Sequence, residues 1–162
     1  MIHTQTQRED TDTGVRDTRT VADGLTNILA DTYRLVFKTH AYHWNVTGAL
    51  FFSVHNLTEQ QYENMFKAAD DLAERIRALG EIAPMCLSTV TGNSVISDKG
   101  RSMSAREMVT DLANDHERIA HRLHDLIELA GEHRDPVTED LATARAAFHE
   151  EATWMLRATA AE

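Results

Sequence analysis

Apolar side chains recur every three or four positions through most of the chain, which is the spacing of one face of an α-helix. The pattern predicts four long helices, near residues 20–46, 51–79, 104–130 and 136–158. Only two prolines and seven glycines occur among 162 residues, and helix-forming alanine, leucine, glutamate and arginine are abundant. The sequence therefore predicts an all-α fold, in one domain that is large enough to bury a sizeable core.

The ends of these segments carry helix-boundary signals. Gly48, Gly80 and Gly131 follow the first three segments, where glycine commonly ends a helix. Ser104-Ala-Arg-Glu107 has the spacing of a capping box, in which each side chain accepts a hydrogen bond from the other residue's backbone N–H. Asp135-Pro136 would begin the last helix with an acidic cap and a proline in the first turn.

The connection between the second and third helices, residues 81–103, is long. Long connections in compact domains usually have a purpose. Its apolar residues predict a short extra helix packed on the surface of the bundle: Leu87, Val90, Val95 and Ile96. The connection also holds Cys86, the only cysteine, which we expect to be a small core residue. A single cysteine cannot form an internal disulfide, which suits a reducing compartment.

Residues 1–17 are polar and predict a flexible tail that precedes a folded domain of residues 18–162. The formal net charge of the chain is −10. That charge disfavours general binding to nucleic acid and suits a protein that attracts cations. The tail has no lysine, so we expect no DNA binding through it. The sequence has no apolar run of the ~18 residues that a membrane span needs, and its start lacks the apolar core of a secretory signal.

Residues 40–80 concentrate the side chains that bind metal ions. On a helix with about 100° per residue and His55 at zero, Glu59 lies near ~40°, Asp70 near ~60° and Glu74 near ~100°. These four side chains therefore point into one quadrant of the second helix. The first helix adds two imidazoles, because its apolar stripe continues into His40 and His43. That stripe consists of Val21, Leu25, Ile28, Leu29, Thr32, Leu35 and Val36.

The four side chains of the second helix form two pairs, His55 with Glu59 and Asp70 with Glu74. The pairs are roughly 16 to 22 Å apart at about 1.5 Å per residue, whereas metal–ligand bonds are only about 2.0–2.6 Å long. One ion cannot touch both pairs. The pairs are symmetric about the point between residues 64 and 65, however. An antiparallel two-fold copy of the helix would set His55 opposite Glu74 of the copy. Each dimer would then have two metal sites, and each site would combine histidine and carboxylate side chains from both chains.

The alternative for this stripe is an acidic face exposed to solvent, and Glu63 lies on the same side. Neighbouring apolar residues weaken that alternative: Phe51, Phe52, Val54, Leu57, Met65, Phe66, Leu72 and Ile76. A lone histidine on an apolar stripe is more often a core residue than a ligand. Because the second helix carries its own stripe of metal-binding residue types, a ligand role is favoured for His43. Whether His40 has a role at the site stays open. We expect the remaining histidines of the third helix to be core or surface residues: His116, His121 and His124.

Three ordered motifs, H-W-N-V-x-G, F-x-x-x-H-x-x-x-E and D-x-x-x-E-R-I-R-x-L-G, resemble the Dps proteins, the miniature ferritins of bacteria and archaea. The resemblance runs from about Val21 to Ala158. It implies a ferritin-like four-helix bundle. It also implies a ferroxidase centre shared by two-fold-related subunits, with His43, His55 and Glu59 from one chain and Asp70 and Glu74 from the other. Many relatives have aspartate at the position of Glu59, and the longer side chain would shift or weaken the second metal position.

The same resemblance implies further roles. Trp44 would lie close to the iron and take up stray oxidising equivalents, and the short helix would contribute to the dimer contact. Asp140 falls where the family places acids lining a three-fold iron channel. The implied protein is a cytoplasmic, dodecameric shell, with association with the nucleoid left open. It would oxidise Fe(II), preferably with hydrogen peroxide, store ferric mineral and so protect DNA.

Two observations bear on the choice between functions. The Glu-x-x-His motif of ordinary ferritins is absent from the sequence, which favours a site between subunits over a site within one bundle. Imidazoles and carboxylates together suit Fe(II) and its Fe(III) product. Two alternatives stay open: a DNA-compacting protein with secondary ferroxidase activity, and a helical oligomer that binds no metal.

Overall fold

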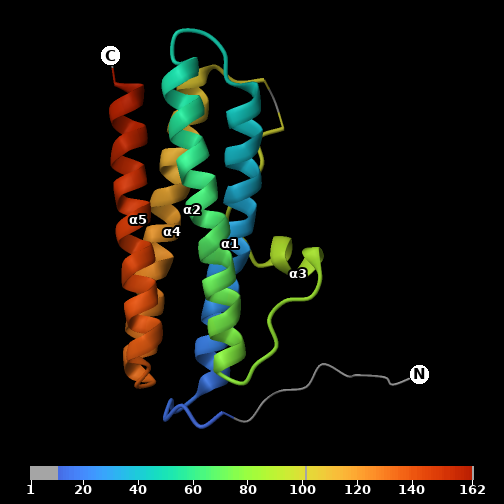
Figure 1. Ribbon diagram of the computed structural model, residues 1–162, viewed down its shortest axis with the longest axis vertical. Coiled ribbons are helices and arrows are strands. Elements are labelled where there is room, and N and C mark those ends of the chain that lie inside the picture. The colour runs from blue at the N-terminus through green and yellow to red at the C-terminus, as the bar shows by residue number, and fades with distance from the viewer. Residues whose placement is uncertain (1–10, 101, 162) are drawn as a thin grey trace, which may run out of the picture.

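Four long helices lie side by side in the computed structural model, which describes residues 11–100 and 102–161 (Figure 1). They are α1 (Thr18–Asn45), α2 (Phe51–Ala78), α4 (Ala105–Glu132) and α5 (Pro136–Ala160). The short helix α3 (Leu87–Gly92) lies in the long connection, beside α1. The described residues include no strand. The predicted all-α bundle with a short extra helix is therefore confirmed.

Local sequence explains where these helices begin. The Asp17 carboxylate accepts a hydrogen bond from the Thr20 N–H at the start of α1. The predicted capping box at Ser104 and the Asp135 cap with its proline are both present, at the starts of α4 and α5. Such caps satisfy backbone N–H groups that have no partner within the helix.

The connection between α2 and α4 runs the length of the bundle, so α2 and α4 point the same way while α1 and α5 point the other way (Figure 1). The bundle core is a continuous cluster of apolar side chains contributed by all four long helices. Its largest fully buried members include Leu25, Leu35, Met65, Leu72, Leu112, Ile119, Leu123 and Leu156.

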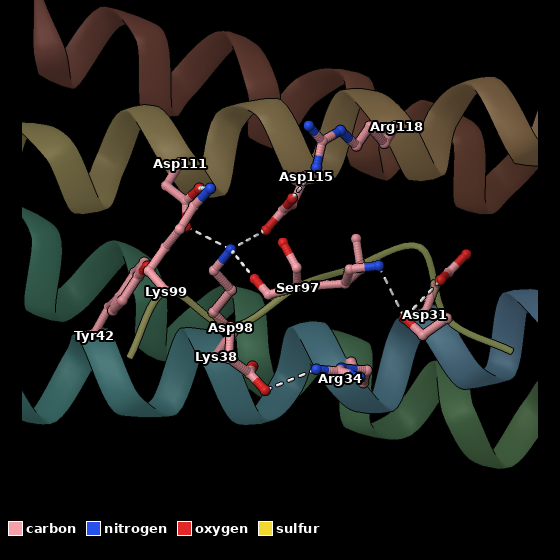
Figure 2. A network of polar contacts seen from close by, with 12 residues as sticks. Asp31, Arg34, Lys38, Tyr42, Ser97, Asp98, Lys99, Asp111, Asp115 and Arg118 are labelled. Carbon is pink, nitrogen blue, oxygen red and sulfur yellow. Dashed lines mark hydrogen bonds and ion pairs between the residues drawn. The ribbon is translucent and has the colours of Figure 1, made fainter. Parts of the chain in front are cut away.

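A buried polar network fastens the extended part of the connection to the bundle, as Figure 2 shows. The Lys38 ammonium is 3% exposed and lies 2.5 Å from a carboxylate oxygen of Asp111 and 2.5 Å from one of Asp115. It also donates to the Ser97 carbonyl at 3.0 Å. A buried charge is tolerated when it is paired and hydrogen-bonded in this way. The network fixes the connection against α1 and α4.

The two carboxyl groups of this network respond differently to their surroundings. Burial alone would raise the pKa of Asp111, but hydrogen bonds from Lys38 and Tyr42 outweigh it and lower that pKa. Burial of Asp115 is nearly complete, and its pKa is raised despite the contact with Lys38. The difference follows from the cost of placing a charge in a medium of low polarity.

Two expectations from the sequence are wrong in detail. Gly131 does not end its helix, because α4 continues to Glu132 and Arg134 adopts the left-handed conformation with φ 59°. A Cβ on Gly131 would lie 2.6 Å from Glu139 Oε1, so this glycine leaves room for the end of the Glu139 side chain of α5. Cys86 is exposed instead of forming part of the core. It precedes the short α3, where hydrogen bonds with the Ser88 and Thr89 hydroxyls lower its pKa to about 7.

The predicted tail, residues 1–17, falls largely outside the described residues. Its last residues contact the bundle: Val15 packs against the core and the Arg16 N–H donates to the His133 carbonyl at 3.0 Å. None of the helices that the structure describes has the length and apolar composition that crossing a bilayer requires.

Candidate metal centre

His43 and His55 meet near the end of the bundle where α1 turns into α2. The connecting turn is short and includes Gly48, whose φ of 89° lies in the left-handed region that glycine adopts readily. Because α2 returns antiparallel to α1, two residues twelve positions apart face each other. Their rings stack with centroids 3.7 Å apart and an interplanar angle of 19°. His43 is buried and His55 is half-buried.

Reciprocal hydrogen bonds orient the two rings. His43 Nδ1 lies 2.9 Å from the His55 carbonyl oxygen, and His55 Nδ1 lies 3.1 Å from the His43 carbonyl oxygen. A carbonyl oxygen can only accept, so each Nδ1 carries the proton and each Nε2 keeps a free lone pair. Histidines that bind metals commonly donate their other N–H to a carbonyl in this manner. The lone pair of each Nε2 is therefore not used by these two hydrogen bonds.

The Thr58 hydroxyl supports this arrangement and was not identified from the sequence. It lies 3.3 Å from His43 Nδ1 and donates to the Val54 carbonyl at 2.7 Å. Thr58 is fully buried, one turn after Val54 on α2. A buried threonine in a helix usually bonds the preceding turn, so the sequence gives no signal that its oxygen also reaches an imidazole.

Aromatic rings surround the histidine pair. Phe51 stacks on His55 at 5.0 Å, and Tyr62 lies 5.3 Å from His43 and 3.8 Å from His40. Trp44 is 63% exposed and stacks on His40 at 5.1 Å. The structure therefore connects Trp44 to the pair through other rings. Burial, and then the neighbouring His43, lowers the pKa of His40. The spacing of ligand types did not point to Tyr62, although it lies seven residues after His55 and so on the same side of α2.

The predicted carboxylate ligands are exposed on α2. Glu59 lies one turn from His55, whereas Asp70 and Glu74 lie far along the helix. At about 1.5 Å per residue, the nearer of them, Asp70, is roughly 22 Å from His55. Among the residues that the structure describes, no three of the His, Cys, Asp and Glu side chains are grouped closely enough to hold a metal. One chain thus brings His43 and His55 together and leaves Asp70 and Glu74 apart from them. The assignment of all five as ligands stays a prediction.

The other candidates are placed as follows. His116 is buried, whereas His121 and His124 are exposed, which agrees with the expectation of core and surface histidines. Asp140 is exposed near the start of α5, and its assignment to an iron channel stays a prediction.

A bundle of four long helices, with one long crossover connection and an oriented histidine pair, has the architecture of a ferritin-like protein. The family model for the ferritin-like domain matches residues 22–162. A DNA protection during starvation protein of Helicobacter pylori is 32% identical over 135 residues, which are 83% of this chain and 94% of that protein. The chain belongs to the Dps family. A low-temperature-induced protein of Nostoc is 38% identical over 135 residues, covering 82% of this chain and 75% of that protein.

Solved structures agree with this assignment. Dps from Staphylococcus aureus has a TM-score of 0.85 at 30% identity, covering 88% of this chain and 95% of that one. Dps from Vibrio cholerae, described as a member of a broad superfamily of ferritin-like diiron-carboxylate proteins, has a TM-score of 0.83 at 30% identity, covering 88% and 89%. At the level of the family, these relationships support iron storage and DNA protection.

Proposed function

We propose that the protein oxidises Fe(II), preferably with hydrogen peroxide, at centres between two-fold-related subunits. His43, His55 and Glu59 of one chain and Asp70 and Glu74 of its partner would bind the iron. The ferric product would be stored in a hollow dodecameric shell in the cytoplasm, and DNA would be protected because free Fe(II) and peroxide are both removed. The observation that carries the proposal is the oriented histidine pair at one end of α2, with the acidic pair far along the same helix.

The chemistry follows from the ligand types. Two Fe(II) ions give two electrons to one hydrogen peroxide, which takes up two protons and becomes two water molecules. The O–O bond breaks in a two-electron step, so no hydroxyl radical is released. Neutral Nε2 atoms allow the reduced ion to bind, and carboxylates stabilise the extra positive charge of the oxidised ion.

Exposed aromatic and aliphatic side chains support a two-fold contact. Phe37 and Phe66 are each 61% exposed and Leu87 is 73% exposed, on α1, α2 and α3 respectively. These three side chains line one largely apolar pocket together with Tyr33, Val36, His40 and Val90, and its polar members are Arg34, Thr91 and Asp98. Monomeric proteins rarely expose large apolar patches, and a large exposed patch commonly marks an interaction site. A copy turned by the two-fold axis would cover this patch and bring the acidic half of α2 to the histidine pair.

The direct test is oxidation of Fe(II) by the purified protein. Stoichiometric peroxide under anaerobic conditions is expected to produce ferric absorbance faster than dissolved oxygen does in a separate aerobic mixture. Two iron ions should be consumed per peroxide, with no spin-trapped hydroxyl radical. Plasmid DNA in the same mixture would remain uncut. Equal rates with and without the protein, or DNA cleavage equal to that of the protein-free control, would contradict the proposal.

Charge placed in the apolar patch should prevent the two-fold contact. We expect Phe66→Lys to shift the assembly toward monomers, because a charged lysine there would lose its hydration against the apolar side chains of the patch. Light scattering at a fixed protomer concentration measures the shift. Thr110→Lys on the exposed side of α4 is the matched control and should keep the parent's assembly. Unchanged assembly of Phe66→Lys would place the contact elsewhere.

A further inference from the structure

The short helix α3 contributes two side chains to the apolar patch, yet little apolar packing attaches it to the bundle. Leu87 and Val90 both line the patch. Val90 is the only buried one of the six residues of α3, all of which the structure describes. The helix packs against α1. A helix this short is not stable by itself in water, because its first hydrogen-bonded turn is unfavourable to form. Contacts outside α3 must therefore hold it in place.

Arg34 of α1 makes two polar contacts that hold α3 and the segment after it. Its Nη1 donates to the Thr91 carbonyl at 3.3 Å, near the end of α3. Its Nη2 donates to Asp98 Oδ2 at 2.7 Å, as Figure 2 shows. The last carbonyls of a helix have no partner within it, so the guanidinium also satisfies one of these groups. Arg34, Thr91 and Asp98 line the same pocket as Leu87, so these contacts border the patch.

The Asp31 carboxylate holds the residues that follow α3. Asp31 lies one turn before Arg34 on α1 and is fully buried. Its Oδ1 accepts hydrogen bonds from the Ser94 hydroxyl and the Val95 N–H, both at 2.8 Å. Its Oδ2 accepts from the Arg122 guanidinium of α4 at 2.6 Å. Hydrogen bonds to an ionised group are stronger than those between neutral groups. This one carboxylate therefore fastens the connection to two helices of the bundle.

The patch lies where a second copy of the chain would meet it on a two-fold axis. Phe66 lines the patch from α2 and lies beside the point between residues 64 and 65 about which the two predicted ligand pairs are symmetric. Contacts about a two-fold axis join identical surfaces, so the patch of one chain would meet that of the other. Phe66 stands on a long helix that the core fixes, whereas Leu87 and Val90 depend on the contacts that hold α3.

We propose that Arg34 and Asp31 are positioning residues of the two-fold contact, because they hold α3 against α1 and so complete the surface that a second copy covers. This inference rests on the proposed function, since it concerns the same contact. A surface that is ordered before association loses less conformational freedom on binding, and it therefore binds more tightly. Without these contacts the four long helices would remain folded, but the incoming copy would have to order α3.

Arg34→Met keeps an aliphatic side chain and removes both hydrogen bonds of the guanidinium. We expect the protomer concentration at which half of the assembly dissociates to rise about 10-fold, as the loss of two ordinary hydrogen bonds implies. Sedimentation velocity over a dilution series measures this concentration, and circular dichroism should show an unchanged helix content. Arg157→Met is the matched control, because it removes a comparable ion pair with Glu117 between α5 and α4, and it should match the parent.

Amide hydrogen exchange measures whether α3 itself loosens. In the Phe66→Lys background, where the two-fold contact is expected to be weakened already, Arg34→Met and Asp31→Asn should each speed the exchange of residues 87–98 by about 10-fold. Exchange in α2 and α5 should stay unchanged. Because Asp31 is buried, Ser94→Ala serves as a milder variant, which removes one hydrogen bond of that carboxylate and should act in the same direction.

The assembly of the parent separates this inference from the proposed function. A parent that does not assemble at any concentration would contradict the two-fold contact of the proposed function, and this inference with it. If the parent assembles and Arg34→Met assembles equally well, the inference alone is overturned. Unchanged exchange of residues 87–98 in the Arg34 and Asp31 variants would overturn it too.

Discussion

Two inactive variants are expected to restore each other's iron oxidation when they assemble together. His43→Ala/His55→Ala removes the imidazole half of the centre, and Asp70→Asn/Glu74→Gln removes the acidic half. Each variant alone should lose more than about 100-fold in rate, since loss of a mere partner of a metal ligand already costs 10–100-fold. In a mixed two-fold dimer, one centre combines both intact halves and the other combines both defective halves.

Random mixing at equal concentration would place intact centres at about one quarter of all positions, because half of the dimers are mixed and each has one good centre of two. Stopped-flow measurement of ferric absorbance after co-expression gives that fraction. Two variants with defects in the same half, such as His43→Ala with His55→Ala, form the control and should show no recovery. Full activity of isolated monomers, or no recovery in mixed shells, would exclude a shared centre.

Acid is expected to destabilise the fold through a second histidine pair, inside the bundle. His116 on α4 and His149 on α5 are 0% and 1% exposed, and their Nδ1 atoms lie 2.9 Å apart. One Nδ1–H donates to the other Nδ1, so only one proton occupies that contact. His116 Nε2 has no hydrogen-bond partner among the described residues. Burial, and then the charge of Arg145, lowers the pKa of His116 to about 3.

The pKa of His149 is also lowered well below 6.5, by burial first and by His116 and Arg145 next. Below pH 6.5 the unfolded chain therefore binds protons on these rings that the folded chain does not bind. Stability is fully present above that pH and falls as the pH decreases. Two pH units, from 6.5 to 4.5, should cost roughly 3 kcal/mol for each ring that stays neutral.

Urea unfolding at pH 7.0 and 4.5, at a fixed protomer concentration, measures the loss. His116→Leu/His149→Leu replaces both partners by apolar side chains of similar size, which can be nearly neutral at pH 7. That variant should lose much less stability on acidification than the parent. His121→Leu, an exposed position on the same helix, should behave like the parent. Equal losses in the parent and the double variant would show that other groups control the acid response.

The long helices could be predicted from the sequence, whereas the surroundings of some single residues could not. Periodicity placed the four long helices, because the helix repeat sets which side chains face the core, and caps such as Ser104 and Asp135 mark where helices begin. The short helix was expected in the long connection, but its bounds were not predicted. Two interpretations of single residues were wrong. Gly131 was interpreted as a helix end, but α4 continues to Glu132, and the space beside Gly131 is taken by the end of the Glu139 side chain. Cys86 was expected in the core, but composition says nothing of which side of α3 meets the bundle.

The sequence by itself determined the helices, their apolar sides and the separation of His55 from Glu74 on one helix, since a repeat of fixed rise and rotation sets all three. Only the tertiary structure decided which atoms face one another across helices. The turn at Gly48 brings each Nδ1 of the His43 and His55 pair to the other's carbonyl, and the packing of α4 on α5 buries His116 against His149. These contacts depend on the register between helices, which no local spacing in the chain specifies.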